Sequence, residues 1–295
     1  MCAATRPSEP DLLSSRRNPL VRSLRLLHEA RGRRSGGRLL LEGTHLFQET
    51  LRAGIPPQEV LCTAAWRERH GHLLGRLTAA TTLRLATPEV LAAAATTGHP
   101  DGVVLTIPFP PPAGPPAAGS LLLVLDRIQD PGNLGTLLRT ALAAGVEQVW
   151  LAGGADPFQP KVLRASSGAA LTLPLRRMAP EDLAEQLAAL RRGGHRLVAT
   201  AVPGGENPPA VAPYWQIDWT QPTALLLGNE AAGLAPERLA GADDLVTIPH
   251  AAAVESLNVA VAAAPLLLER LRQTLEHGSR PAGGRMPPIP RSSSR

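Results

Sequence analysis

Residues 121–135 read LLLVLDRIQDPGNLG, and this stretch decides the fold. Its first five residues form a continuous apolar run, which is typical of a strand in a parallel sheet that is covered on both faces. Residues 130–133 predict a turn, because proline fixes one φ while glycine and asparagine tolerate positive φ. A helix over 133–144 is expected to follow, with Gly145 as its stop. The strand therefore ends at a polar turn ahead of a helix, which is where ligands bind in open α/β sheets.

Two later segments repeat this arrangement of a buried strand that ends at polar residues. Apolar residues 224–227 lead into Gly-Asn-Glu at 228–230, and apolar residues 245–248 lead to Pro249. Taken singly, a simple strand-to-helix turn explains each of these ends better than a binding site does. Together, three strand ends that carry polar groups predict one shared pocket.

Side chains close to these strand ends suit a polar or anionic ligand. Arg139 follows Asn133 by six residues, about two helical turns, so we expect both on the same side of the helix. A fork-shaped cation beside a polar turn suits phosphate, although a surface salt bridge explains a helical arginine equally well. Ser256 is the predicted N-cap of a long helix over 257–275, and Asn258 offers both a donor and an acceptor.

The length of 295 residues allows about two domains. Residues 108–120 are dominated by Pro, Ala and Gly, which predicts a semi-stiff linker. Before it, residues 14–107 alternate short strands and helices, as in a small α/β domain. After it, residues 121–277 alternate in the same way, which predicts a parallel sheet. Residues 1–13 and 278–295 are expected to be disordered.

Within the first domain, two helix starts have recognisable signals. Asn18-Pro19 predicts the start of one helix, because proline suits the first helical turn. Thr44 is the predicted N-cap of a helix that ends near Ala53.

Arginine outnumbers lysine overwhelmingly, since Lys161 is the only lysine, so the arginine excess by itself is weak evidence for phosphate binding. Its position says more, because one acid, Glu29, stands within a basic stretch near the amino end. Such a stretch predicts a surface that contacts phosphates, although a solvated helix face is an equally good explanation. The arginines predicted to contact phosphate are Arg16, Arg17, Arg22, Arg25, Arg31, Arg33 and Arg34.

Several classes of protein are disfavoured. The two cysteines form no CxxC pair, so neither a disulfide framework nor a metal site is predicted. No apolar stretch is long enough to span a bilayer, and residues 1–9 lack the apolar core of a signal peptide, so we expect a cytoplasmic protein. No GxGxxG follows a first strand, which argues against a dinucleotide-dependent oxidoreductase.

The order and the residues of the three segments resemble those of the SpoU (TrmH-type) RNA ribose 2′-O-methyltransferases of the SPOUT class. This resemblance covers residues 121–275. The amino-terminal part resembles the RNA substrate-binding domain of that family, a ribosomal-protein-like α/β fold. Residues 18–20, 41–46 and 100–104 carry this second likeness.

The resemblance implies a parallel sheet with a trefoil knot near its carboxyl end, S-adenosylmethionine as the methyl donor, and a homodimer as the active unit. It also implies which positions form the site. The implied catalytic positions are Arg139, Asn133, Glu230, Ser256 and Asn258. The implied cofactor-binding positions are Leu227, Gly228, Asn229, Ile248, Pro249 and Leu257.

Ribosomal RNA, of the 23S type or its precursor, is the expected substrate, because a two-domain layout with an RNA-binding module favours it over transfer RNA. A tRNA ribose methyltransferase and a methyltransferase that protects ribosomes from an antibiotic remain alternatives. A non-catalytic RNA-binding ribosome-assembly factor is a further alternative. The intact Arg139, Glu230 and Asn258 argue against that last class.

Three positions depart from the family pattern. His250, Ala252 and Ala260 stand where relatives commonly carry Met, Gly and Ser. Alanine replaces glycine without strain only where φ is negative, so we expect a negative φ at Ala252.

Overall fold

The structure, a computed structural model, describes residues 12–202 and 210–276. The chain forms two compact units, and three segments contribute to each. Unit 1 comprises Met1–Pro112, Asp130–Arg139 and Ala155–Thr172, and unit 2 comprises Ala113–Gln129, Thr140–Gly154 and Leu173–Arg295. The first break falls within the stretch expected to be a linker, but the chain then returns to unit 1 twice. The tails expected to be disordered lie outside the described residues, apart from Leu12 and Leu13.

Unit 1 contains a mixed five-stranded sheet in the order β1-β4-β3-β5-β2. Its strands are β1 (Leu12–Leu13), β2 (Arg38–Glu42), β3 (Glu59–Cys62), β4 (Thr82–Ala86) and β5 (Val103–Pro108). β5 is antiparallel to both of its neighbours, whereas β4 is parallel to both of its own. Placing Leu12 and Leu13 in a disordered tail was wrong, because they pair with Leu85 and Ala86 of β4.

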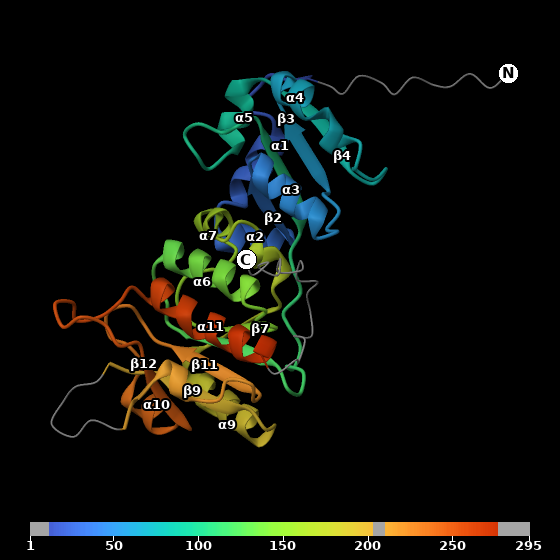
Figure 1. The fold of residues 1–295 in the computed structure, drawn as a ribbon. Coiled ribbons are helices and arrows are strands. Elements are labelled where there is room, and N and C mark those ends of the chain that lie inside the picture. Colours follow the sequence, from blue (N-terminus) through green and yellow to red (C-terminus); the bar gives the residue numbers. More distant parts are fainter. Residues whose placement is uncertain (1–11, 203–209, 277–295) are drawn as a thin grey trace, which may run out of the picture. The chain divides into compact units, whose positions relative to one another are not determined.

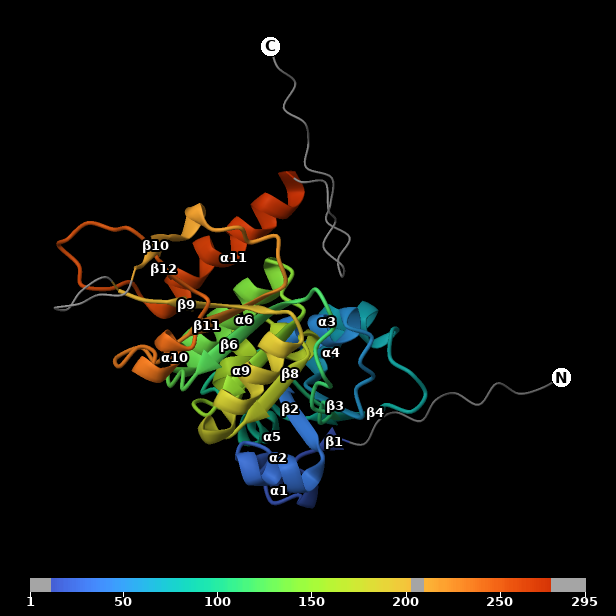
Figure 2. The same cartoon turned by 90° about the horizontal axis from the view of Figure 1, so that it is seen from below.

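Helices cover both faces of this sheet, as Figure 2 shows for α1 and α5 on one side and α3 and α4 on the other. The helices of unit 1 are α1 (Pro19–Leu26), α2 (Ala30–Gly36), α3 (Thr44–Arg52), α4 (Ala64–Leu74), α5 (Pro88–Ala94), α7 (Pro160–Ala165) and α8 (Ala169–Thr172). The predicted start of α1 is confirmed, because the Asn18 side chain accepts a hydrogen bond of 2.8 Å from the Leu20 N–H.

The predicted cap of α3 was wrong. Thr44 is the first helical residue, and its N–H donates to the carboxylate of the distant Asp101 at 2.6 Å. The Thr44 hydroxyl instead accepts the indole N–H of Trp66 at 2.7 Å. A residue from another segment therefore satisfies this helix end, which no local pattern reveals.

Unit 2 contains a seven-stranded sheet in the order β10-β12-β9-β11-β6-β7-β8. The strands are β6 (Leu121–Asp126), β7 (Gln148–Ala152), β8 (Leu175–Met178), β9 (Arg196–Thr200), β10 (Ala212–Pro213), β11 (Thr223–Leu227) and β12 (Asp244–Thr247). All six pairings are parallel, so the predicted parallel sheet is confirmed. The two-residue strand β10 is too short to leave a pattern in the sequence.

The helices of unit 2 cover both faces of its sheet, with α11 (Val259–Glu276) on one side and α9 (Leu183–Arg192) and α10 (Pro236–Ala240) on the other (Figures 1 and 2). Leu183, Leu187 and Leu190 of α9 are buried in the core that α9 forms with the sheet. The helix α6 (Pro131–Ala143) begins in unit 1 and ends in unit 2. Within the described residues, we find no helix with the length and hydropathy needed to cross a bilayer.

The strand order brings the predicted strand ends to one edge of this sheet. β11 lies between β6 and β9, with Leu227 opposite Leu125. β12 lies beyond β9, with Val246 opposite Thr200. Because every strand is parallel, β6, β11 and β12 all end at the same edge.

Candidate active site

The loops that follow β6 and β11 are joined by hydrogen bonds. A Glu230 carboxylate oxygen accepts the Gln129 N–H at 3.0 Å, and the Asn229 amide donates to the Arg127 carbonyl at 2.9 Å. Arg127 has a φ of 58°, which few residues other than glycine adopt. Two of the three predicted segments therefore form one continuous surface at the edge of the sheet.

The loop after β11 is a tight, closed turn. Asn229 and Gly233 exchange backbone hydrogen bonds of 3.1 and 2.9 Å, and the Asn229 side chain accepts the N–H groups of Ala231 and Ala232. A Cβ on the buried Gly228 would lie 2.3 Å from the Gly233 carbonyl carbon, so only glycine fits there. Asn229 thus uses its polar groups to shape the loop.

The third segment follows β12, which β9 separates from β11, so these strands are about 10 Å apart. Ile248 and Leu257 are half-buried, and Pro249 is exposed. The His250 ring nitrogen Nδ1 lies 2.7 Å from the Ile248 carbonyl oxygen. Ala252 has no positive φ, as the substitution of alanine for glycine requires.

Asn258, rather than Ser256, caps the carboxyl-terminal helix. Its side-chain oxygen accepts the N–H groups of Ala260 and Val261 at 2.9 and 3.3 Å. α11 accordingly begins at Val259, two residues later than expected. Predicting Ser256 as the N-cap was therefore wrong, and Ser256 is an exposed loop residue.

The second half of α6 carries Arg139, which contacts a serine on the turn between α7 and α8. An Arg139 guanidinium N–H donates to the Ser167 hydroxyl at 3.1 Å. The N-cap of α6 is Asp130, whose carboxylate accepts the Asn133 N–H at 2.8 Å, and this hydrogen bond lowers the pKa of Asp130. The expectation that Asn133 and Arg139 share a side was wrong, because six residues of a continuous α-helix are about 1.7 turns.

The predicted catalytic residues divide between the units. Asn133 and Arg139 belong to unit 1, whereas Glu230, Ser256 and Asn258 belong to unit 2. Sequence reasoning missed Ser167 as the partner of Arg139, and its sole signal is a run of small residues, Ser-Ser-Gly, between two short helices.

Six of the seven predicted RNA-binding arginines are exposed, on α1, α2 and the segment before them. Arg33 is the exception, because its side chain is 3% exposed and lies 2.6 Å from the Asp156 carboxylate. It also donates to the carbonyls of Leu27 and His28. Assigning Arg33 to RNA was therefore wrong, since its charge is already paired inside unit 1.

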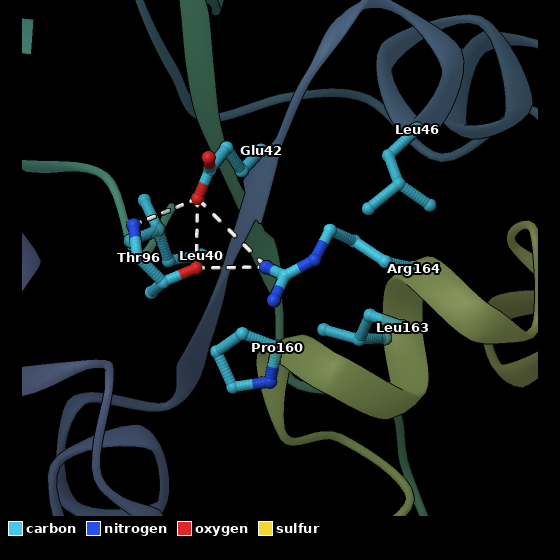
Figure 3. Close-up of a pocket in the computed structure, with 7 residues that line it drawn as sticks. All are labelled: Leu40, Glu42, Leu46, Thr96, Pro160, Leu163 and Arg164. Carbon is cyan, nitrogen blue, oxygen red and sulfur yellow. Dashed lines mark hydrogen bonds and ion pairs between the residues drawn. The ribbon is translucent and has the colours of Figure 1, made fainter. Parts of the chain in front are cut away.

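A buried carboxylate, that of Glu42, links α7 to the sheet of unit 1 (Figure 3). Glu42 of β2 accepts the N–H and the hydroxyl of Thr96, each at 2.7 Å, and the hydroxyl of Thr97. Arg164 of α7 donates to the Thr96 hydroxyl at 2.8 Å and lies 3.9 Å from Glu42. The carboxylate therefore has several donors, as burial of a charge requires.

The composition of the loops after β11 and β12 suits a neutral or cationic ligand. Residues 227–233 and 248–258 contain no lysine and no arginine, but they include Glu230 and Glu255. Half-buried aliphatic side chains and tight loop backbone complete the surface. Among the residues that the structure describes, no group of His, Cys, Asp and Glu could hold a metal ion.

Two family models match the chain. The SpoU rRNA Methylase family matches residues 120–268, and the MRM3-like substrate binding domain matches residues 18–105. A tRNA/rRNA methyltransferase of Synechocystis, described as uncharacterised, is 44% identical over 88% of this chain and 93% of its own length. The 23S rRNA (guanosine(2553)-2′-O)-methyltransferase RlmP of Bacillus subtilis is 32% identical over 86% of this chain and 97% of its own length.

A solved structure is similar over nearly the whole chain. The AdoMet-bound rRNA methyltransferase from Sinorhizobium meliloti has a TM-score of 0.74 and 30% identity, over 89% of this chain and 97% of that one. The likeness therefore includes the amino-terminal part as well as the parallel sheet.

Proposed function

The chain belongs to the SpoU rRNA Methylase family, and from that premise we propose that it methylates a ribose 2′-oxygen of 23S-type ribosomal RNA. It is an RNA 2′-O-methyltransferase that uses S-adenosylmethionine. One observation carries the assignment of the site. Hydrogen bonds join the loops after β6 and β11, which contain two of the three segments that resemble the family, at one edge of a parallel sheet. The cytoplasmic location expected from the sequence would follow from this substrate.

The residues at this edge fit S-adenosylmethionine. Gly228, Ile248 and Leu257 would hold it, because half-buried aliphatic side chains and loop backbone can accept a molecule with both apolar and polar parts. Glu230 and Glu255 suit a sulfonium cation, because they stand in loops, 227–233 and 248–258, that contain no lysine or arginine. When bound, the cofactor supplies a methyl group on an excellent leaving group, so the protein must align the reactants and increase the nucleophilicity of the ribose oxygen.

Arg139 would provide that activation. A guanidinium remains protonated in proteins, so it is poorly suited to act as a base. We assign it instead to the phosphate beside the target ribose, where its charge stabilises the developing negative charge on the 2′-oxygen. Its five N–H donors allow it to bind Ser167 and still donate to a phosphate.

The remaining family positions would shape the site and not take part in proton transfer. Asn258 would fix the start of α11, and Glu230 would fix the loop after β11 to Gln129. Asn133 stands in the first turn of α6, where its backbone N–H donates to the Asp130 carboxylate. Ser256 is exposed and could contact the RNA or the cofactor directly.

Residues 14–107 would be the RNA substrate-binding domain, 108–120 the linker and 121–277 the methyltransferase domain. The two family matches, at 18–105 and 120–268, support these boundaries. The exposed arginines of α1 and α2 would bind RNA phosphates. The domain would recognise structured RNA by its shape and its unpaired bases.

The test of this function is methyl transfer in vitro to unmodified RNA with a labelled donor. We expect label in 23S rRNA, at one ribose whose 3′ linkage becomes resistant to alkali, because a methylated 2′-oxygen cannot attack that linkage. Transfer RNA and 16S rRNA are the matched substrates in the same assay. Label in tRNA alone would contradict the ribosomal assignment, and no label in any RNA would contradict the activity.

A homodimer and a trefoil knot complete the proposal. α11 carries the exposed apolar side chains Val261, Leu268 and Leu275, which are 60%, 46% and 42% exposed. Their spacing of seven residues places them along one helix face, as at helix–helix interfaces. The insertion of β11 between β6 and β9 supports a chain crossing in the carboxyl-terminal half.

Replacing Leu268 with glutamate should dissociate this dimer. A charge placed in an apolar interface without a partner weakens association by about 100-fold or more. Light scattering coupled to size exclusion should show a dimer for the unmodified protein and a monomer for Leu268→Glu at micromolar concentration. Leu26→Glu on α1 is the control, because Leu26 is 65% exposed and lies away from α11 in the sequence. A monomeric unmodified protein, or a dimeric Leu268→Glu variant, would exclude α11 as the interface.

A further inference from the structure

The turn between α7 and α8 holds a serine in a strained conformation. Ser167 has a φ of 49°, and within the described part of the chain Arg127 is the one other non-glycine residue with a positive φ. Glycine and asparagine adopt this left-handed region far more readily than serine does. Surrounding contacts must therefore impose this conformation on Ser167. Such outliers cluster at functional sites, where their geometry is part of the mechanism.

The turn is packed directly against the face of α6 that carries Arg139. A Cβ on Gly135 would lie 2.4 Å from the Ala165 Cβ and 2.9 Å from the Ser166 nitrogen. Gly135 is four residues before Arg139, so both occupy the same face of the helix. The missing side chain at Gly135 thus allows the turn to approach closely enough for its next residue, Ser167, to reach the guanidinium.

We propose that Ser167 is a positioning residue that aims the Arg139 guanidinium at the phosphate of the target nucleotide. This inference rests on the proposed function of Arg139. An exposed arginine side chain samples many rotamers, and one fixed acceptor at 3.1 Å restricts them. Because a hydroxyl is neutral, it orients the guanidinium without cancelling the positive charge that the reaction needs. A carboxylate at the same place would neutralise that charge.

The residues on either side of Ser167 are held in place by contacts with α3, with α7 and with the sheet of unit 1. Gly168 has a φ of +84°, and a Cβ on it would lie 2.7 Å from the Glu49 Cβ of α3. The Ser166 hydroxyl donates to the Leu163 carbonyl at 3.1 Å, and α7 is held by the contacts of Arg164 with Thr96 and Glu42. The turn is therefore a rigid support, built partly from the segment that matches the substrate-binding domain.

The test compares Ser167→Gly with Ser167→Asn. Glycine removes the hydroxyl and adopts positive φ freely, so the fold should tolerate it. We expect kcat to fall about tenfold or more, because a hydrogen bond to a charged group is lost, while the Kd for S-adenosylmethionine stays the same. Asparagine also tolerates this φ and offers an amide oxygen, so Ser167→Asn should recover most of the activity. Thr136→Ala on α6 is the control, because its hydroxyl donates to the Gly132 carbonyl of the same helix at 2.9 Å, and it should retain full kcat.

A second readout does not depend on turnover. In NMR spectra of protein with isotope-labelled arginine, the Arg139 side-chain signal, assigned with Arg139→Lys, should broaden or shift in Ser167→Gly and remain in place in Thr136→Ala. An unchanged Arg139 signal in Ser167→Gly would overturn the inference whether or not an RNA substrate is in hand. Unchanged kcat in Ser167→Gly, or equal loss in Ser167→Gly and Ser167→Asn, would also overturn it. Failure of the unmodified protein to methylate any RNA would instead refute the proposed function.

Discussion

Arg139→Ala should lower methyl transfer by about a thousandfold, the effect typical of losing a group that stabilises charge in the transition state. Its Kd for S-adenosylmethionine should stay within about twofold, because the cofactor residues lie on the loops after β11 and β12 and the guanidinium acts on the RNA. Single-turnover rates with saturating RNA would measure the first quantity, and calorimetric titration of the cofactor would measure the second.

The matched control for this variant is Arg69→Ala. Arg69 is also an exposed helical arginine, and its guanidinium donates to the Ala65 carbonyl of its own helix at 3.2 Å. Its removal should leave the rate unchanged. If Arg139→Ala lost cofactor binding, Arg139 would belong to the cofactor site and the proposed role would fail. A variant that kept the full rate would exclude Arg139 from the chemistry altogether.

Gly228→Ala should abolish cofactor binding through a steric effect. The new methyl group would lie 2.3–2.4 Å from the backbone of Gly233 and Leu234, so the closed loop would have to open. Displacing such a loop by about 1 Å is enough to cost about 100-fold, and we expect at least that loss in affinity for S-adenosylmethionine. Overpacking should also lower the free energy of unfolding by about 1–3 kcal/mol.

Calorimetric titration and urea unfolding would separate these two effects. Gly71→Ala is the control, because a Cβ at Gly71 has no atom within 4 Å, and we expect unchanged cofactor affinity there. If Gly228→Ala folds and binds the cofactor as tightly as the unmodified protein, the loop after β11 does not form the cofactor site.

Local patterns in the sequence predicted the parallel sheet and the positions of the polar strand ends. Buried apolar runs such as 121–125 and 224–227 became neighbouring strands, because a strand covered on both faces requires continuous apolar residues. The Asn18-Pro19 start of α1 was equally predictable, since the cap and its partner are two residues apart.

Contacts between distant residues were not predictable in this way. Arg33 appeared to belong to a basic surface, but its partner Asp156 is 123 residues away in the sequence. Thr44 lost its expected capping role to Asp101 for the same reason. The positive φ of Ser167 also has no local signal, because the residues beside it pack against distant segments: Ala165 and Ser166 against Gly135, and Gly168 against Glu49.

The place of β11 in the sheet has a consequence for how the protein is made. β6 finds its neighbour β11 about a hundred residues later in the chain, and pairings between such distant residues form slowly. While the ribosome is still translating the intervening segment, one edge of β6 has no native neighbour and exposes unpaired backbone groups. Completion of the fold must therefore wait until residue 227 has left the exit tunnel, so chaperone protection during synthesis should matter more for this half of the molecule than for the segment ending at β5.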